Sequence, residues 1–218
     1  MKIFGIGMNY LPHTQELEGR AWRPEEPVIF LKADSALLKD RKPFFVPDDM
    51  GRIDYEGELV VRICRLGKAI PQRFAHRYYD AVTVGLDFTA RDLQRRAREQ
   101  GLPWTVCKGF DGSACIGEWL PIDTISPLPP ITSTAPTPST ASVIPFRLEK
   151  NGTTVQQAST AEMLFSIDEL VSYLSRFFTL KTGDLIFTGT PAGVGPVDVG
   201  DHLQGYVADR LVLDVRCK

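Results

Sequence analysis

Short apolar runs bounded by turn residues dominate this chain of 218 residues. The clearest runs, each of which predicts a strand, lie at 28–33, 55–63, 81–88, 146–150 and 185–188. In the run 55–63 apolar and polar residues alternate, so Glu56 and Glu58 are expected on one face of the strand and the apolar side chains on the other. The dipeptide Asn151-Gly152 predicts a two-residue hairpin turn.

Two segments carry the signals that begin a helix. Thr89 followed by Asp92 resembles a capping box and predicts a helix of about ten residues. Ser166 followed by Glu169 gives the same signal before an amphipathic run that reaches residue 178. Strands outnumber these isolated helices and do not alternate with them. The sequence therefore predicts an α+β or mostly β architecture.

The composition changes between residues 121 and 145, where Pro, Ser and Thr dominate and Asp123 is the only charged residue. Such composition is typical of extended or loop-rich chain. We predict a loop excursion with a short edge strand at 142–144, and a linker between two domains is the alternative. The length suits one large domain or two small ones, and we expect a single domain over 1–218, with 1–50 as its N-terminal part.

Composition and charge exclude several classes of protein. The net charge of -2 does not suggest a nucleic-acid binder. No apolar run approaches the roughly 18–20 residues that span a membrane, and the N-terminus lacks the features of a signal peptide, so a cytoplasmic protein is expected. The four cysteines form no C-x-x-C pair, which argues against a disulfide framework or a cysteine zinc site. The three histidines are far apart, so oxygen ligands are expected in any metal site.

Glu56-Gly57-Glu58 is the first candidate for chemistry. Residues two apart on a strand share a face, and two carboxylates that close repel one another unless a cation lies between them. Magnesium or manganese would meet that need, because both prefer oxygen ligands. Asp87, near the end of an apolar strand, would complete an all-carboxylate site. Solvated surface glutamates and a turn aspartate are the alternative interpretations.

Three further segments carry candidate groups. Lys108 stands beside glycine in the segment KGFDG and is placed to direct a cation at a substrate carboxylate, although most lysines are simply solvated. His13 and Glu16 would share one helix face, so that Glu16 orients His13 to activate water, or the two form a surface pair. The loop 188–193 offers hydroxyl and backbone N–H groups that suit an anion, or it is a plain connection.

These segments together resemble the fumarylacetoacetate hydrolase family. The matching blocks are NYLPHTQE at 9–16, DYEGELVV at 54–61, GLDFTARDLQ at 85–94, KGFDG at 108–112, NGTTVQQASTAEM at 151–163 and LKTGDLIFTGTPAGVG at 180–195. They occur in the family's order and span nearly the whole chain. The resemblance implies a mixed β-roll with few helices, one catalytic domain and a homodimer.

The resemblance also implies roles for individual residues. The ligands of a divalent metal, Mg²⁺ or Mn²⁺, would be Glu56, Glu58 and Asp87. Lys108 would bind the oxo-acid group of a small-molecule 2-oxo acid substrate, with Arg91, Gln94 and Thr190 nearby. His13 and Glu16 match a catalytic dyad carried on a lid segment around 10–20. We expect no nucleic acid and no membrane as partners.

The expected activity is hydrolysis of a C–C bond in acylpyruvate-type 2,4-dioxo acids. In this hypothesis His13, oriented by Glu16, removes a proton from the attacking water, and Lys108 and Thr190 hold the oxo-acid end. Oxaloacetate decarboxylation is an expected companion activity. The alternatives are an isomerase or hydratase of unsaturated 2-oxo or 2-hydroxy dioic acids in aromatic catabolism, and a non-catalytic protein that binds metal and oxo acid.

Overall fold

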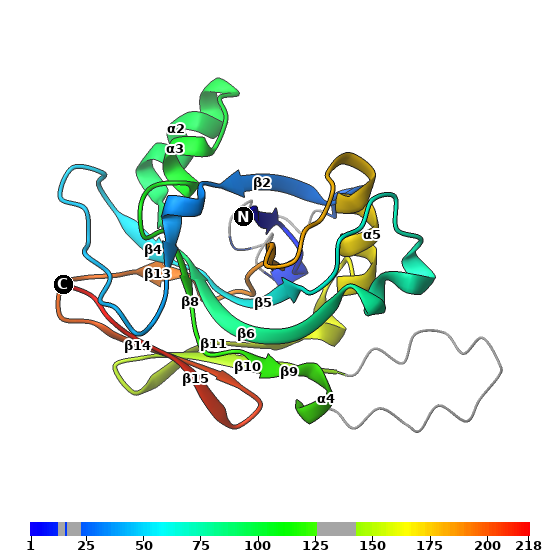
Figure 1. The fold of residues 1–218 in the computed structure, drawn as a ribbon. Helices are drawn as coiled ribbons and strands as arrows, with labels where there is room; N and C mark the ends of the chain where they lie inside the picture. Colours follow the sequence, from blue (N-terminus) through cyan, green and yellow to red (C-terminus); the bar gives the residue numbers. More distant parts are fainter. Residues whose placement is uncertain (13–15, 17–22, 126–142) are drawn as a thin grey trace.

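Three β-sheets form most of the computed structural model, which describes residues 1–12, 16, 23–125 and 143–218 (Figure 1). The large sheet has the order β2 (Val28–Lys32), β1 (Ile3–Gly7), β12 (Leu185–Phe187), β5 (Gly57–Ile63), β6 (Tyr79–Asp87), β8 (Ala114–Ile116) and β3 (Leu37–Leu38), and β9 (Leu120–Pro121) also pairs with β6. The second sheet has the order β11 (Thr153–Ser159), β10 (Pro145–Lys150), β14 (His202–Val207) and β15 (Arg210–Arg216). The smallest has the order β13 (Gly195–Pro196), β4 (Ile53–Tyr55) and β7 (Thr89–Ala90).

The large sheet is mixed. Strand β1 runs parallel to β12 and β3 runs parallel to β8, whereas the pairs β1–β2, β12–β5, β5–β6 and β6–β8 are antiparallel. The long strand β6 curves across the molecule and contacts β14 and β15 of the second sheet (Figure 1). The mixed, strand-rich α+β architecture predicted from the sequence is confirmed.

Strand β5 is packed on both faces. Leu59, Val61 and Ile63 lie in the main core between the sheets, as the alternation predicted. Val60, on the opposite face, packs with Phe187 in a second apolar cluster. The face that carries the glutamates is therefore covered by protein, and the interpretation of Glu58 as a solvated surface residue is wrong.

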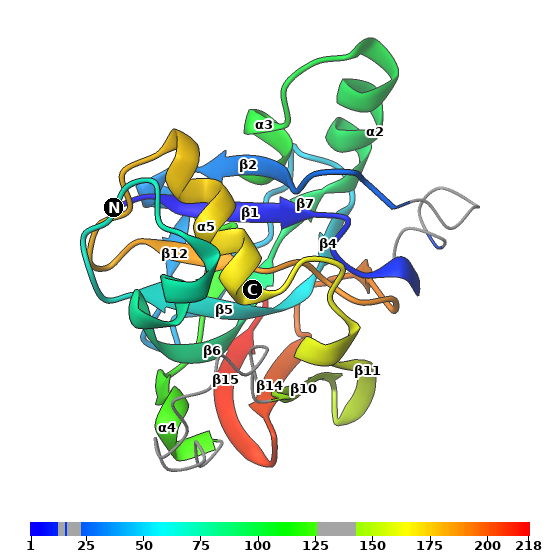
Figure 2. The ribbon, with the colours of Figure 1, turned by 90° about the vertical axis from the view of Figure 1, so that its right-hand side faces the viewer.

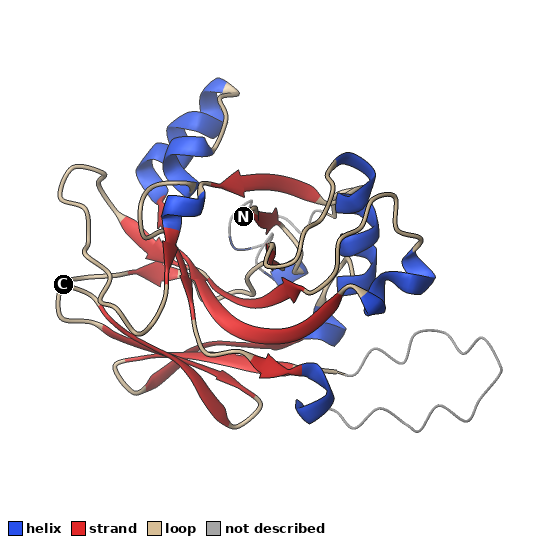
Figure 3. Cartoon of the chain, in the orientation of Figure 1, coloured by secondary structure: helices blue, strands red, loops and turns tan. Residues whose placement is uncertain are grey.

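Helices α2 (Arg91–Gln100) and α3 (Thr105–Lys108) lie together on one side of the molecule, and α5 (Ile167–Phe177) lies on the other (Figures 1, 2 and 3). Further helical elements in the described part of the chain are α4 (Ile122–Ile125) and the 3₁₀ turns η1 (Asp34–Ala36), η2 (Gln72–Arg77) and η3 (Thr160–Glu162). The capping box before α5 is confirmed, since Ser166 and Glu169 bond each other's backbone N–H. No helix among the described residues is long and apolar enough to cross a membrane.

Two local predictions need correction. Helix α2 has the expected length, but Thr89 belongs to β7 and does not cap it. The Thr89 hydroxyl, which a helix cap would use, accepts a hydrogen bond from Lys108 Nζ at 2.7 Å instead. The edge strand expected at 142–144 is also wrong where it can be checked, because Val143 and Ile144 precede the start of β10 and Ser142 lies outside the described residues.

Asn9 fastens the end of β1 to two distant segments. Its side chain is fully buried, and its Nδ2 donates to the carbonyls of Thr188 (2.7 Å) and Phe165 (3.1 Å). Its Oδ1 accepts the N–H of Phe165 at 2.8 Å. The loop that follows β12 is thereby held against β1, and this loop lines the candidate site described below.

Replacing Asn9 with Ala is expected to lower the free energy of unfolding by about 3 kcal/mol, because buried backbone groups lose their partners. Urea denaturation followed by circular dichroism measures this loss. Gln100→Ala, at the exposed end of α2, serves as the control and should change stability by less than about 0.5 kcal/mol. Equal stability of the two variants would contradict the assigned role of Asn9.

Candidate active site

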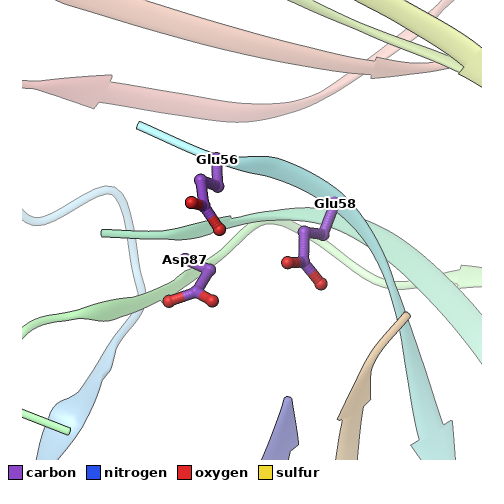
Figure 4. A group of neighbouring side chains, drawn as sticks. All are labelled: Glu56, Glu58 and Asp87. Atoms are coloured by element: carbon purple, nitrogen blue, oxygen red, sulfur yellow. The ribbon is translucent and has the colours of Figure 1, made fainter. Parts of the chain in front are cut away.

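Three carboxylates converge where β5 and β6 meet. Glu56 lies between β4 and β5, Glu58 lies on β5, and Asp87 ends β6. The antiparallel ladder pairs Gly57 with Leu86, and the N–H of Asp87 donates to the carbonyl of Glu56 at 2.8 Å, so all three side chains share one face of the sheet. One oxygen of each lies within 4.8 Å of the others, and all three side chains are buried (Figure 4).

Lys108 lies directly against this acidic triad of Glu56, Glu58 and Asp87. Its Nζ donates to Glu56 Oε2 and to Asp87 Oδ2, both at 2.7 Å. Burial alone would lower the pKa of Lys108, but the charges of Asp87 and Glu56 outweigh it and raise that pKa. The ammonium therefore stays charged and supplies a cation between the carboxylates of Glu56 and Asp87.

Glu58 is held differently from the other two carboxylates. Its Oε2 accepts the backbone N–H of Gly189 at 2.7 Å. Burial raises the pKa of Glu58 well above its usual range, and the negative charge of Asp87 raises it further, while Lys108 lowers it. A carboxylate in this state gains most from a nearby cation, since ionising it inside the protein is costly.

Arg91, the first residue of α2, is committed to neighbouring side chains. Its guanidinium donates to Glu56 Oε1 at 2.6 Å, to Asp54 Oδ2 at 2.8 Å and to Gln94 Oε1 at 2.6 Å. These contacts orient Glu56 and Gln94, so Arg91 helps to fix the geometry of the site. Its direct contact with substrate stays a prediction.

Gln156 on β11 is a site residue that the sequence interpretation missed. Its Oε1 accepts the N–H of Gly57 at 2.8 Å, and its Nε2 donates to Thr190 Oγ1 at 2.8 Å. Thr190 Oγ1 in turn donates to the carbonyl of Gly57 at 2.9 Å. A Cβ on Gly57 would lie 2.9 Å from Gln156 Oε1, which explains why glycine separates the two glutamates.

A cleft opens above the triad. Its polar side is lined by Gln94, Lys108 and Thr190, all buried, together with the carboxylates. Its apolar side includes Phe30 and Trp104, whose ring centroids lie 5.8 Å apart. The sequence-predicted substrate-side residues Gln94, Thr190 and Lys108 are therefore brought together at one cleft with the predicted metal ligands.

The predicted dyad is described only in part. His13 lies outside the described residues. Glu16 is exposed, and its carboxylate accepts the N–H of Gly193, with oxygens at 3.2 and 3.4 Å. Gly193 belongs to the loop that carries Thr190, so Glu16 contacts the loop that contributes to the cleft.

Lys32 is the second site residue that sequence reasoning missed. Its side chain is completely buried at the end of β2, and its Nζ lies 2.6 Å from Asp87 Oδ1. The contact is an ion pair without the angles of a directional hydrogen bond. Burial lowers the pKa of Lys32, and the charge of Asp87 opposes that effect.

The fold places a buried acidic triad, which could hold a metal ion, at the bottom of a cleft. The family model described as the C-terminal domain of fumarylacetoacetate (FAA) hydrolase matches residues 2–217. The chain therefore belongs to the fumarylacetoacetate hydrolase family, and the predicted resemblance is confirmed. The relatives described next are enzymes of this family, and they support an enzymatic function for this chain.

Named relatives and solved structures carry several reactions. The oxaloacetate tautomerase YcgM of Escherichia coli is 36% identical over 202 residues, covering 93% of this chain and 86% of the relative. The structure of fumarylpyruvate hydrolase from Pseudomonas aeruginosa with Mn²⁺ and pyruvate has a TM-score of 0.87 at 35% identity, covering 100% of this chain and 89% of that one. The 2-hydroxyhepta-2,4-diene-1,7-dioate isomerase of Mycobacterium marinum has a TM-score of 0.78 at 30% identity, covering 99% and 73%.

Proposed function

We propose that this protein is a divalent-metal-dependent enzyme that hydrolyses a C–C bond in acylpyruvate-type 2,4-dioxo acids. The observation that carries the proposal is the triad of buried carboxylates within 4.8 Å, with the ammonium of Lys108 beside it in a cleft. The Mn²⁺ and pyruvate bound by the fumarylpyruvate hydrolase of Pseudomonas aeruginosa support the same chemistry.

The triad suits Mg²⁺ or Mn²⁺ because all its ligand atoms are oxygens and all are buried. Glu56, Glu58 and Asp87 would hold the ion. Bound there, it would act as a Lewis acid that stabilises negative charge on the oxo-acid oxygens. The raised pKa of Glu58 fits this assignment, because a cation would relieve the cost of ionising that buried group.

Protein groups supply the remaining steps. Lys108 and Gln94 orient the oxo-acid end, and Phe30 and Trp104 exclude water from one side of the cleft. Water activated by His13 adds to the distal carbonyl carbon, and the bond between that carbon and its neighbour breaks. The electron pair passes to the oxo-acid fragment as an enolate, which takes up a proton, giving a 2-oxo acid and a carboxylic acid. The contact of Glu16 with Gly193, in the loop that carries Thr190, supports a dyad here.

Keto–enol conversion of oxaloacetate is the second candidate. The Escherichia coli and Bos taurus oxaloacetate tautomerases, each 36% identical to this chain, favour it. This reaction needs an enolate that is stabilised by Lys108 and by the cation that the triad would hold, but no attacking water. Decarboxylation of oxaloacetate would draw on the same stabilisation. The isomerase of Mycobacterium marinum supports a third reaction, on unsaturated dioic acids.

The test uses metal-stripped protein, ultraviolet absorbance of acetylpyruvate and of freshly dissolved enol oxaloacetate, and a separate assay for pyruvate. Metal-dependent loss of acetylpyruvate with release of pyruvate is the expected result. The variant His13→Ala should lose this activity while it still accelerates loss of the oxaloacetate enol. If the protein accelerates only the loss of the oxaloacetate enol, the reaction is tautomerisation. If pyruvate is released only from oxaloacetate, the reaction is decarboxylation. The absence of any metal-dependent reaction of either compound would contradict the proposal.

A further inference from the structure

Lys32 is a buried cation at the edge of the large sheet. It is the last residue of β2, and neither its side chain nor that of its partner Asp87 has any exposed surface. An ammonium and a carboxylate taken out of water this completely are costly unless further polar contacts hold both groups. The pair is therefore a specific feature of the fold.

Several acceptors hold the ammonium of Lys32 in place. Its Nζ donates to the carbonyl of Lys108 and to both the carbonyl and the hydroxyl oxygen of Ser113, the latter two at 3.1 Å. The Ser113 hydroxyl also donates to the Lys108 carbonyl at 2.9 Å. The end of α3 and the residue preceding β8 thus form a fixed cradle for Lys32, which in turn contacts Asp87.

Each oxygen of the Asp87 and Glu56 carboxylates contacts one basic side chain. Lys32 contacts Asp87 Oδ1, and Arg91 contacts Glu56 Oε1. Lys108 contacts the other oxygen of each, Asp87 Oδ2 and Glu56 Oε2. Lys108 lines the cleft and Lys32 does not. One oxygen of Asp87 is therefore held by a residue outside the cleft, and the other contacts Lys108, which lines it.

We infer that Lys32 is a positioning residue that fixes Asp87 for metal binding. This inference rests on the proposed function, because it takes Asp87 as a metal ligand. Lys32 touches no reacting atom and acts through the carboxylate alone. Outer groups that orient a ligand typically change metal affinity by about 10- to 100-fold when they are removed.

The experiment measures Mn²⁺ binding by titration calorimetry on the full chain without substrate. Lys32→Met should weaken the dissociation constant for Mn²⁺ by about 10- to 100-fold. At saturating Mn²⁺ the variant should recover most of its kcat, because the ligand is misplaced and not removed. A wild-type dissociation constant in this variant would overturn the inference.

Lys2→Met is the matched control. Lys2 Nζ lies 2.6 Å from Asp184 Oδ2, so this variant also strips a lysine from a buried aspartate, at the opposite end of β1 and β12 from the site. It should lose stability and keep the Mn²⁺ affinity of the wild type. An equal loss of affinity in both variants would assign the effect to general destabilisation and would overturn the inference.

Ser113→Ala keeps the test decisive if Lys32→Met does not fold. It removes one acceptor from the cradle, retains the charge of Lys32 and should weaken Mn²⁺ binding severalfold. Wild-type affinity in Ser113→Ala would then overturn the role of Lys32. Failure of the proposed function is distinguishable, since in that case the wild-type protein itself binds no Mn²⁺ at the triad.

Discussion

Glu58→Gln should abolish metal-dependent turnover and at the same time raise the melting temperature of the metal-free protein. Burial, and then the charge of Asp87, raise the pKa of Glu58 in the folded state. Between the unfolded pKa, about 4.3, and this higher folded value, the native state binds more protons than the unfolded state. Stability therefore falls as pH rises through that window. The neutral amide removes this fall, and it also removes a metal ligand.

Thermal unfolding in a chelator from about pH 4.5 upward, followed by titration with Mn²⁺, measures both effects. The wild-type protein should lose stability across the window and regain it with Mn²⁺, whereas Glu58→Gln should show a flatter profile and little response to the metal. Glu99→Gln, on the exposed side of α2, is the control and should follow the wild type. A lower melting temperature for Glu58→Gln in chelator would contradict the assignment.

The acidic triad could be predicted in part, because short-range geometry places two of its three carboxylates. The alternation along 55–63 puts Glu56 and Glu58 on one face, and a single glycine between them marks a tight backbone environment. Asp87 follows from an apolar strand that ends in a carboxylate. The capping box of α5 was readable for the same reason, since Ser166 and Glu169 lie within one turn.

The residues that contact the triad and its neighbours were not predictable, because these contacts join segments that are distant in the chain. Lys32 and Asp87 are far apart in the chain, and a lysine that ends a strand is ordinarily solvated. Gln156 is one of two adjacent glutamines on β11, and its burial depends on a contact with the distant Gly57 that the local sequence does not show. Thr89 was predicted to cap a helix because the local sequence does not show that its hydroxyl bonds the distant Lys108.

The two lysines of the site have separable roles. Lys32 is enclosed by protein acceptors and contacts one carboxylate, whereas Lys108 lines the cleft and bridges two. The oxygens of Glu56 and Asp87 that accept from Lys108 therefore contact a residue that lines the cleft. A cation entering the triad therefore competes with Lys108 for these oxygens, and its arrival would free the ammonium for a substrate carboxylate.

Lys108→Met should consequently change stability in the direction opposite to Glu58→Gln. In chelator it leaves Glu56 and Asp87 without a shared counter-charge, which is expected to cost about 3–5 kcal/mol of unfolding free energy. Its affinity for Mn²⁺ should equal or exceed that of the wild type, because the competing ammonium is gone. Turnover should nevertheless be lost, since Mn²⁺ can restore the charge but cannot orient the oxo acid.

Urea denaturation in chelator and in excess Mn²⁺, together with calorimetric titration, separates these effects. Arg41→Met is the control, because Arg41 pairs with Glu118 at 2.8 Å with both side chains largely exposed, and its loss should cost about 1 kcal/mol or less in either condition. If Lys108→Met lost Mn²⁺ affinity as Glu58→Gln does, Lys108 would be supporting the ligands and not competing for them. Retained affinity with no turnover would place Lys108 on the substrate side of the site.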